Sequence, residues 1–242
     1  GDECVIPAPY WVSYPDMALL ADGVPVSVYA GPEQGYKITP AQLQAALTPR
    51  SKLLFMNSPN NPTGAAYSKA ELRALGAVLE QHPQVVIASD EMYEHIYWAA
   101  EPYSSFVQAN PQLYDRTVTI NGVSKAYAMT GWRIGYCGGP KAIVAAMSTI
   151  QGQSTSNASS ISQRAAAIAL NGDQACVALM NKAFKERHDY VVAGLNAIPG
   201  ISCRPGAGTF YAFAQVEDAM RSIGVKDDNE FAEYLLVQTG GP

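Results

Sequence analysis

Short apolar runs alternate with helical patterns along most of this sequence, and that alternation constrains the fold more than any other feature. The runs cover residues 53–56, 85–88, 117–120 and 134–137. They are mostly apolar, which is typical of strands buried on both faces of a parallel sheet. The sequence therefore predicts an α/β fold, with a mostly parallel sheet flanked by helices.

The helical patterns complete this prediction. One helix should begin after Ser68, which is followed three residues later by Glu71 in a capping-box pattern. Further helices are predicted near 140–150, 157–171 and 173–197, and another around 231–235. After Pro199-Gly200, residues 201–203 and 210–213 are predicted as strands. We expect a large domain over 1–200 and the start of a smaller α+β C-terminal domain over 201–242.

Composition excludes several classes of protein. Of the 242 residues, 48% are hydrophobic and 15% charged, which favours a sizeable core over disorder. The net charge of −5, without a basic stripe, argues against a nucleic-acid partner. No apolar run of about 18 residues occurs, so no membrane span is predicted. With no export signal visible, we expect a cytoplasmic protein. The scattered cysteines and histidines predict no metal site.

Polar side chains follow the predicted strands where ligands bind in such sheets, beyond the carboxyl ends. They include Asn57, Asn61, Asp90, Asn121 and Lys125. Each has a plain structural explanation when taken alone, as a turn former, a helix cap or a solvated cation. Together, a lysine and an acid at one sheet edge suggest carbonyl chemistry, because a neutral lysine attacks carbonyl groups.

Pyridoxal phosphate is the cofactor that uses this pair, with the acid against its ring nitrogen. Lys125 would be the anchor, Asp90 the ring partner and Tyr93 a donor to the ring hydroxyl oxygen. Arg133 could hold the phosphate through a bidentate contact. Trp11 could lie flat against the ring.

Three sequence blocks, at 58–64 (SPNNPTG), 89–95 (SDEMYEH) and 121–136 (NGVSKAYAMTGWRIGY), resemble the signatures of class I/II aminotransferases of fold type I. The segment 8–15 (APYWVSYP) narrows the resemblance to the bacterial aspartate aminotransferase branch, which includes enzymes acting on prephenate. The segments 150–156 and 205–211 also match. The chain resembles the middle of such an enzyme, and we expect both ends to be truncated.

The resemblance implies pyridoxal phosphate as cofactor, bound in the domain over 1–200, and ping-pong transfer of an amino group from aspartate to 2-oxoglutarate. Lys125 would be catalytic, and Trp11 and Asn61 would also touch substrate. The family forms homodimers, so a homodimer is expected. The implied cofactor-binding residues are Trp11, Asn61, Asp90, Tyr93, Ser124, Lys125 and Arg133.

Two departures from the family keep alternatives open. Gly122 stands where many members carry a phosphate-binding serine, and no arginine follows Arg221 to hold a substrate carboxylate. The chain could instead be another fold type I enzyme, such as a carbon–sulfur lyase or a synthase, or a non-catalytic core. A Rossmann nucleotide-binding domain is disfavoured, because no G-x-G-x-x-G follows the first strand.

Overall fold

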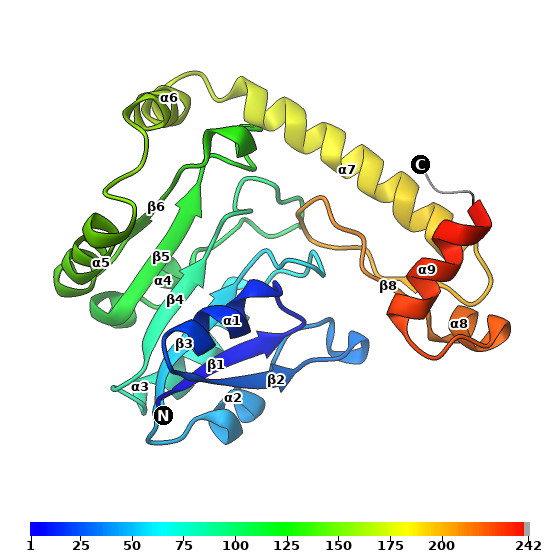
Figure 1. Ribbon diagram of the computed structural model, residues 1–242, viewed down its shortest axis with the longest axis horizontal. Helices are drawn as coiled ribbons and strands as arrows, with labels where there is room; N and C mark the ends of the chain where they lie inside the picture. The colour runs from blue at the N-terminus through cyan, green and yellow to red at the C-terminus, as the bar shows by residue number, and fades with distance from the viewer. Residues whose placement is uncertain (240–242) are drawn as a thin grey trace.

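The computed structural model describes residues 1–239, and its centre is a six-stranded sheet of order β2-β1-β3-β4-β5-β6 (Figure 1). The first five strands in this order are parallel, and β6 runs antiparallel to β5. The strands are β1 (Glu3–Ala8), β2 (Val24–Tyr29), β3 (Ser51–Asn57), β4 (Val86–Asp90), β5 (Thr117–Gly122) and β6 (Gly135–Gly138). The mostly parallel sheet is confirmed.

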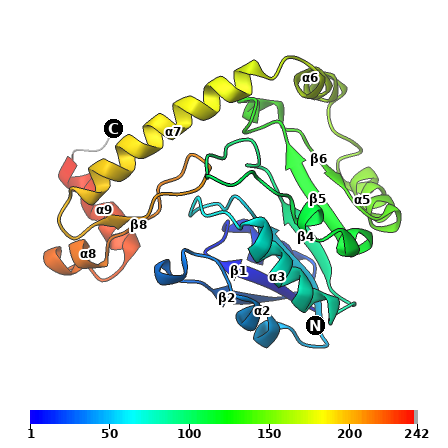
Figure 2. The same ribbon diagram turned by 180° about the vertical axis from the view of Figure 1, so that it is seen from behind.

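Helices cover both faces of the sheet. Successive side chains of β3 enter different clusters, with Leu54 and Met56 in the larger one and Leu53 and Phe55 against the smaller one. The larger cluster packs beneath α2 (Pro40–Ala46), α3 (Lys69–Glu80) and α4 (Phe106–Ala109), and the smaller beneath α1 (Ser13–Leu20). Viewed from behind, α3 lies over the face opposite α1 (Figure 2). Burial on both faces explains why these strands are mostly apolar.

The predicted helices form close to their expected bounds. Ser68 caps α3 by accepting from the Glu71 amide, and the Ser68 amide donates to the Glu71 carboxylate, which completes the capping box. The helices α5 (Lys141–Ser154) and α6 (Ser160–Asn171) follow β6, and α7 (Ala175–Asn196) runs from α6 to the last part of the chain (Figure 1). None of the helices within residues 1–239 is both long enough and apolar enough to cross a membrane.

The last part of the chain differs in part from the prediction. It holds the short strands β7 (Ser202–Cys203) and β8 (Ala214–Gln215), then α8 (Glu217–Ile223) and α9 (Asp228–Thr239). The strand predicted over 210–213 is wrong: this segment is a loop, in which the Phe210 and Tyr211 rings pack against Tyr93 and the Phe213 ring against Tyr36. The division into two domains at residue 200 stays a prediction, and residues 240–242 of it lie outside the described part.

Candidate active site

Three neighbouring strands end beside one cavity of about 270 Å³. The strand β3 ends at Asn57, β4 ends at Asp90, and β5 ends two residues before Ser124. All seven side chains predicted to bind a cofactor line this cavity, as do four that were not predicted. The predicted ones are Trp11, Asn61, Asp90, Tyr93, Ser124, Lys125 and Arg133, and the others are Tyr14, Asn57, Met92 and Tyr211.

Asp90, at the end of β4, presents a carboxylate to the cavity. Its Oδ2 accepts a 2.7 Å hydrogen bond from the Tyr14 hydroxyl, and its Oδ1 accepts one from the Met92 amide at 3.1 Å. Burial raises the pKa of Asp90, and these two hydrogen bonds partly oppose that rise. No described side chain forms an ion pair with Asp90. A positively charged ligand atom beside this carboxylate would therefore be its cationic partner and would favour its ionised form.

Tyr93 is a buried neutral phenol on the cavity wall. Burial raises its pKa well above the usual value, and a hydrogen bond with Tyr211 adds to the rise, while one from Asn61 opposes it. The two tyrosine oxygens lie 2.7 Å apart. Since Tyr93 stays protonated at neutral pH, its hydroxyl can donate to an oxygen of a bound ligand.

Lys125 and Arg133 place two cationic side chains on the same cavity. Among the described residues Lys125 has no ion-pair partner, and its Nζ lies 5.8 Å from the centre of the Phe210 ring. Arg133 adopts a left-handed backbone conformation with φ of 48°, and its Nη1 donates to the Thr130 carbonyl at 3.0 Å. Left-handed non-glycine residues cost free energy and concentrate at functional sites.

Gly122 is fixed by its neighbours. A Cβ at this position would lie 3.1 Å from Met92 Cε, 3.2 Å from Gly135 Cα and 3.2 Å from the Ile134 carbonyl oxygen. A serine would therefore require the adjacent β6 edge to move. The close packing of β5 against β6 therefore favours glycine at position 122.

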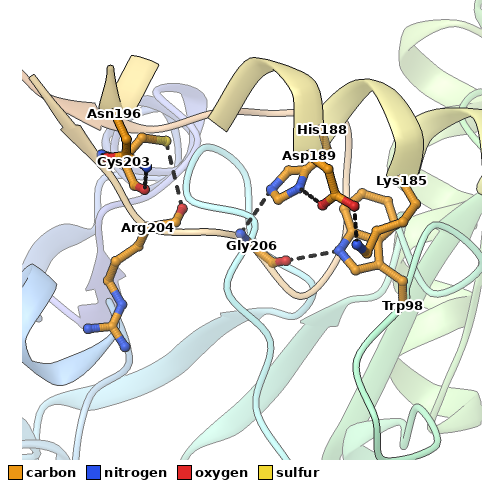
Figure 3. A network of polar contacts seen from close by, with 8 residues as sticks. All are labelled: Trp98, Lys185, His188, Asp189, Asn196, Cys203, Arg204 and Gly206. Atoms are coloured by element: carbon orange, nitrogen blue, oxygen red, sulfur yellow. Dashed lines mark hydrogen bonds and ion pairs between the residues drawn. The ribbon is translucent and has the colours of Figure 1, made fainter. Parts of the chain in front are cut away.

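The loop that carries Tyr211 is attached to α7 and to the segment around Trp98 (Figure 3). The Gly206 amide donates to Nε2 of the buried His188 at 3.0 Å, so this nitrogen carries no proton. The Gly206 carbonyl accepts from Trp98 Nε1 at 2.9 Å. Further along, Thr209 donates its amide to the Ile96 carbonyl at 2.8 Å. These hydrogen bonds hold the loop before Tyr211 against α7 and against the segment 96–98.

Replacing His188 by leucine is expected to destabilise the chain by about 1–3 kcal/mol, because the Gly206 amide loses its acceptor. Urea unfolding followed by circular dichroism measures the change. His188→Gln is the matched control, since its side-chain oxygen can accept the same hydrogen bond. A leucine variant as stable as the parent chain would contradict this role for His188.

Two of the four unpredicted cavity residues carry hydroxyl groups that contact predicted ones. Tyr14 is the second residue of α1 and lies three residues after Trp11, which precedes the helix; the Tyr14 amide donates to the Trp11 carbonyl at 3.1 Å. Tyr211 arrives from the loop that was mistaken for a strand. The three-residue spacing from Trp11 could have suggested Tyr14, and Tyr211 ends the segment 205–211 that resembles the family, although no role was predicted for it.

Comparisons with known proteins identify the family of this chain. The family model of aminotransferase class I and II matches residues 1–240. Aspartate/prephenate aminotransferases from Nitrosomonas europaea and Cereibacter sphaeroides are 52% and 55% identical over 98% and 99% of this chain. The chain spans 61% of the length of each.

Solved structures give the same result. The crystal structure of the aspartate aminotransferase from Rhizobium meliloti matches with a TM-score of 0.93 and 46% identity, over 98% of this chain and 60% of that one. The aromatic aminotransferase from Pyrococcus horikoshii matches with a TM-score of 0.90 and 32% identity, over 98% of this chain and 62% of that one. Sequence and fold agree, and the chain belongs to the class I and II aminotransferases.

Proposed function

We propose that this protein transfers an amino group between an amino acid, with aspartate the first choice, and a 2-oxo acid, with 2-oxoglutarate the first choice, using pyridoxal phosphate. One observation carries the proposal: a lysine and a guanidinium from the connection between β5 and β6 meet the carboxylate at the end of β4 at one cavity. The names of the relatives from Nitrosomonas europaea and Cereibacter sphaeroides support the choice of aspartate.

The residues around the cavity fit the cofactor's chemistry. A carboxylate without a cationic partner among the described residues suits a protonated ring nitrogen, and the phenol of Tyr93 suits a ring oxygen. Arg133 and Ser124 offer a guanidinium and a hydroxyl to a phosphate. When bound, pyridoxal phosphate supplies an electrophilic carbonyl and an electron-withdrawing ring.

Each side chain then has a role at a stated atom. Lys125 Nζ would bind the cofactor carbonyl and later move the proton at the substrate α carbon. The Asp90 carboxylate would hold the proton on the ring nitrogen. The Trp11 ring would cover one face of the cofactor and exclude water, and Asn61 would also touch the substrate.

We also propose that two copies of the chain associate. Large apolar side chains are exposed on α5 and α6, among them Ile150 at 71% and Ile161 at 72% exposure. Exposed apolar groups of this kind favour a protein–protein contact. Sedimentation analysis of the chain should show a dimer, and a monomer at every concentration would count against it.

The function is tested by adding pyridoxal phosphate to the 242-residue chain and reducing with borohydride. The reduced cofactor should be found on the peptide containing Lys125, because this lysine faces the cavity. An amino-transfer assay with aspartate and 2-oxoglutarate then follows. Modification spread over exposed lysines alone would argue against the proposed site, and release of ammonia without amino transfer would point to a lyase.

A further inference from the structure

We propose that Tyr14 is a positioning residue for Asp90. Its hydroxyl donates a hydrogen bond to one carboxylate oxygen and so fixes the orientation of the carboxylate that lines the cavity. This inference rests on the proposed function, in which Asp90 meets the cofactor's ring nitrogen. Tyr14 is not among the predicted site residues, and its role follows from contacts within the protein.

The tyrosine ring is held by packing, so its hydroxyl has a defined place. Tyr14 is only 4% exposed. Its ring stacks on Phe55 with centroids 4.8 Å apart and planes 15° apart, and it meets the Trp11 ring edge-on at 5.5 Å. Tyr14 therefore contacts both the Trp11 indole and the Asp90 carboxylate, which line the same cavity.

Within the described part of the chain, the Asp90 carboxylate is held by neutral donors. The Tyr14 hydroxyl binds Oδ2 at 2.7 Å and the Met92 amide binds Oδ1 at 3.1 Å, one donor to each oxygen. The other titratable groups lining the cavity are Tyr93, Lys125, Arg133 and Tyr211, and none forms an ion pair with Asp90.

Loss of the tyrosine hydroxyl therefore has a consequence for charge as well as for orientation. A buried carboxylate without a cation depends on hydrogen bonds to remain ionised, and those to charged groups are among the stronger ones. With one donor gone, Asp90 would take up a proton at higher pH. It would also be free to rotate about its side-chain bond.

The test is a carboxyl titration of the cofactor-free chain by NMR, with ¹³C-labelled aspartate and the Asp90 signal assigned from Asp90→Asn. In Tyr14→Phe the Asp90 midpoint should rise by roughly one to two pH units. Tyr67→Phe is the matched control. Its hydroxyl is also buried but accepts a hydrogen bond from the Ile38 amide, so its loss should leave Asp90 unchanged. An unshifted midpoint in Tyr14→Phe would overturn the inference.

A second measurement needs no variant at position 14 to fold. In the parent chain with ¹³C-labelled tyrosine, the Cζ signal of Tyr14 should move with the Asp90 midpoint, and a signal that ignores it would also overturn the inference. Both titrations are independent of the cofactor. If borohydride labels Lys125 but the Asp90 midpoint does not shift in Tyr14→Phe, only the positioning role of Tyr14 is rejected. If the Asp90 midpoint shifts as expected but Lys125 is not labelled, only the proposed function is rejected.

Discussion

Replacing Lys125 by alanine is expected to abolish the reducible cofactor adduct and lower the rate of amino transfer by about four orders of magnitude or more. The variant loses both the amine that binds the cofactor carbonyl and the group that moves the substrate proton. No other lysine lines the cavity within the described part of the chain, so none there can take over. Borohydride labelling with peptide mapping and single-turnover kinetics measure the two losses separately.

The fold should survive this change. Within residues 1–239 Lys125 forms no ion pair, and its Nζ lies 5.8 Å from the centre of the half-exposed Phe210 ring. Lys141→Ala is the matched control, because Lys141 is an exposed lysine at the start of α5 and does not line the cavity. A Lys125→Ala chain that turned over at the parent rate would remove Lys125 from its proposed role.

The sequence predicted the sheet well because its strands are buried on both faces. The runs at 53–56 and 85–88 had to be apolar throughout, and this pattern is hard to mistake when helices separate the runs. The strand β2 (Val24–Tyr29) was not predicted. It lies at the edge of the sheet and exposes Val24 and Tyr29, so its side chains do not form a continuous apolar run.

The site was predictable only in part, for a physical reason. Side chains at strand ends converge because parallel strands share an edge, so Asp90 and Lys125 could be placed together from the topology. The Tyr211 hydroxyl reaches Tyr93 across 118 positions of sequence, through a loop attached to α7 at His188. Such a contact depends on tertiary packing, which the local sequence does not reveal. The apolar and aromatic residues at 210–213 led to the prediction of a strand instead.

The second large effect is expected for Asp90→Asn. This change keeps the size of the side chain and removes its negative charge. Removing one partner of a buried charge pair costs about 3–5 kcal/mol, so amino transfer should slow by roughly a hundredfold to several thousandfold. Cofactor affinity should fall as well. Single-turnover kinetics and the dissociation constant for pyridoxal phosphate, followed by quenching of tryptophan fluorescence, measure the two effects.

Charge must be separated from hydrogen bonding for this result to be informative. In Asp90→Asn, the side-chain oxygen of the asparagine can still accept a hydrogen bond from the Met92 amide, and its NH₂ group can donate one to the Tyr14 oxygen. Both local contacts of the carboxylate therefore have counterparts in the variant. A cofactor analogue methylated on the ring nitrogen carries a fixed positive charge and no proton there. If Asp90 acts by holding that proton, the analogue should restore much of the lost rate in Asp90→Asn and little in Lys125→Ala. Asp173→Asn, at an exposed aspartate before α7, should match the parent chain. Equal rates for Asp90→Asn and the parent chain would show that the carboxylate at the end of β4 serves the fold alone.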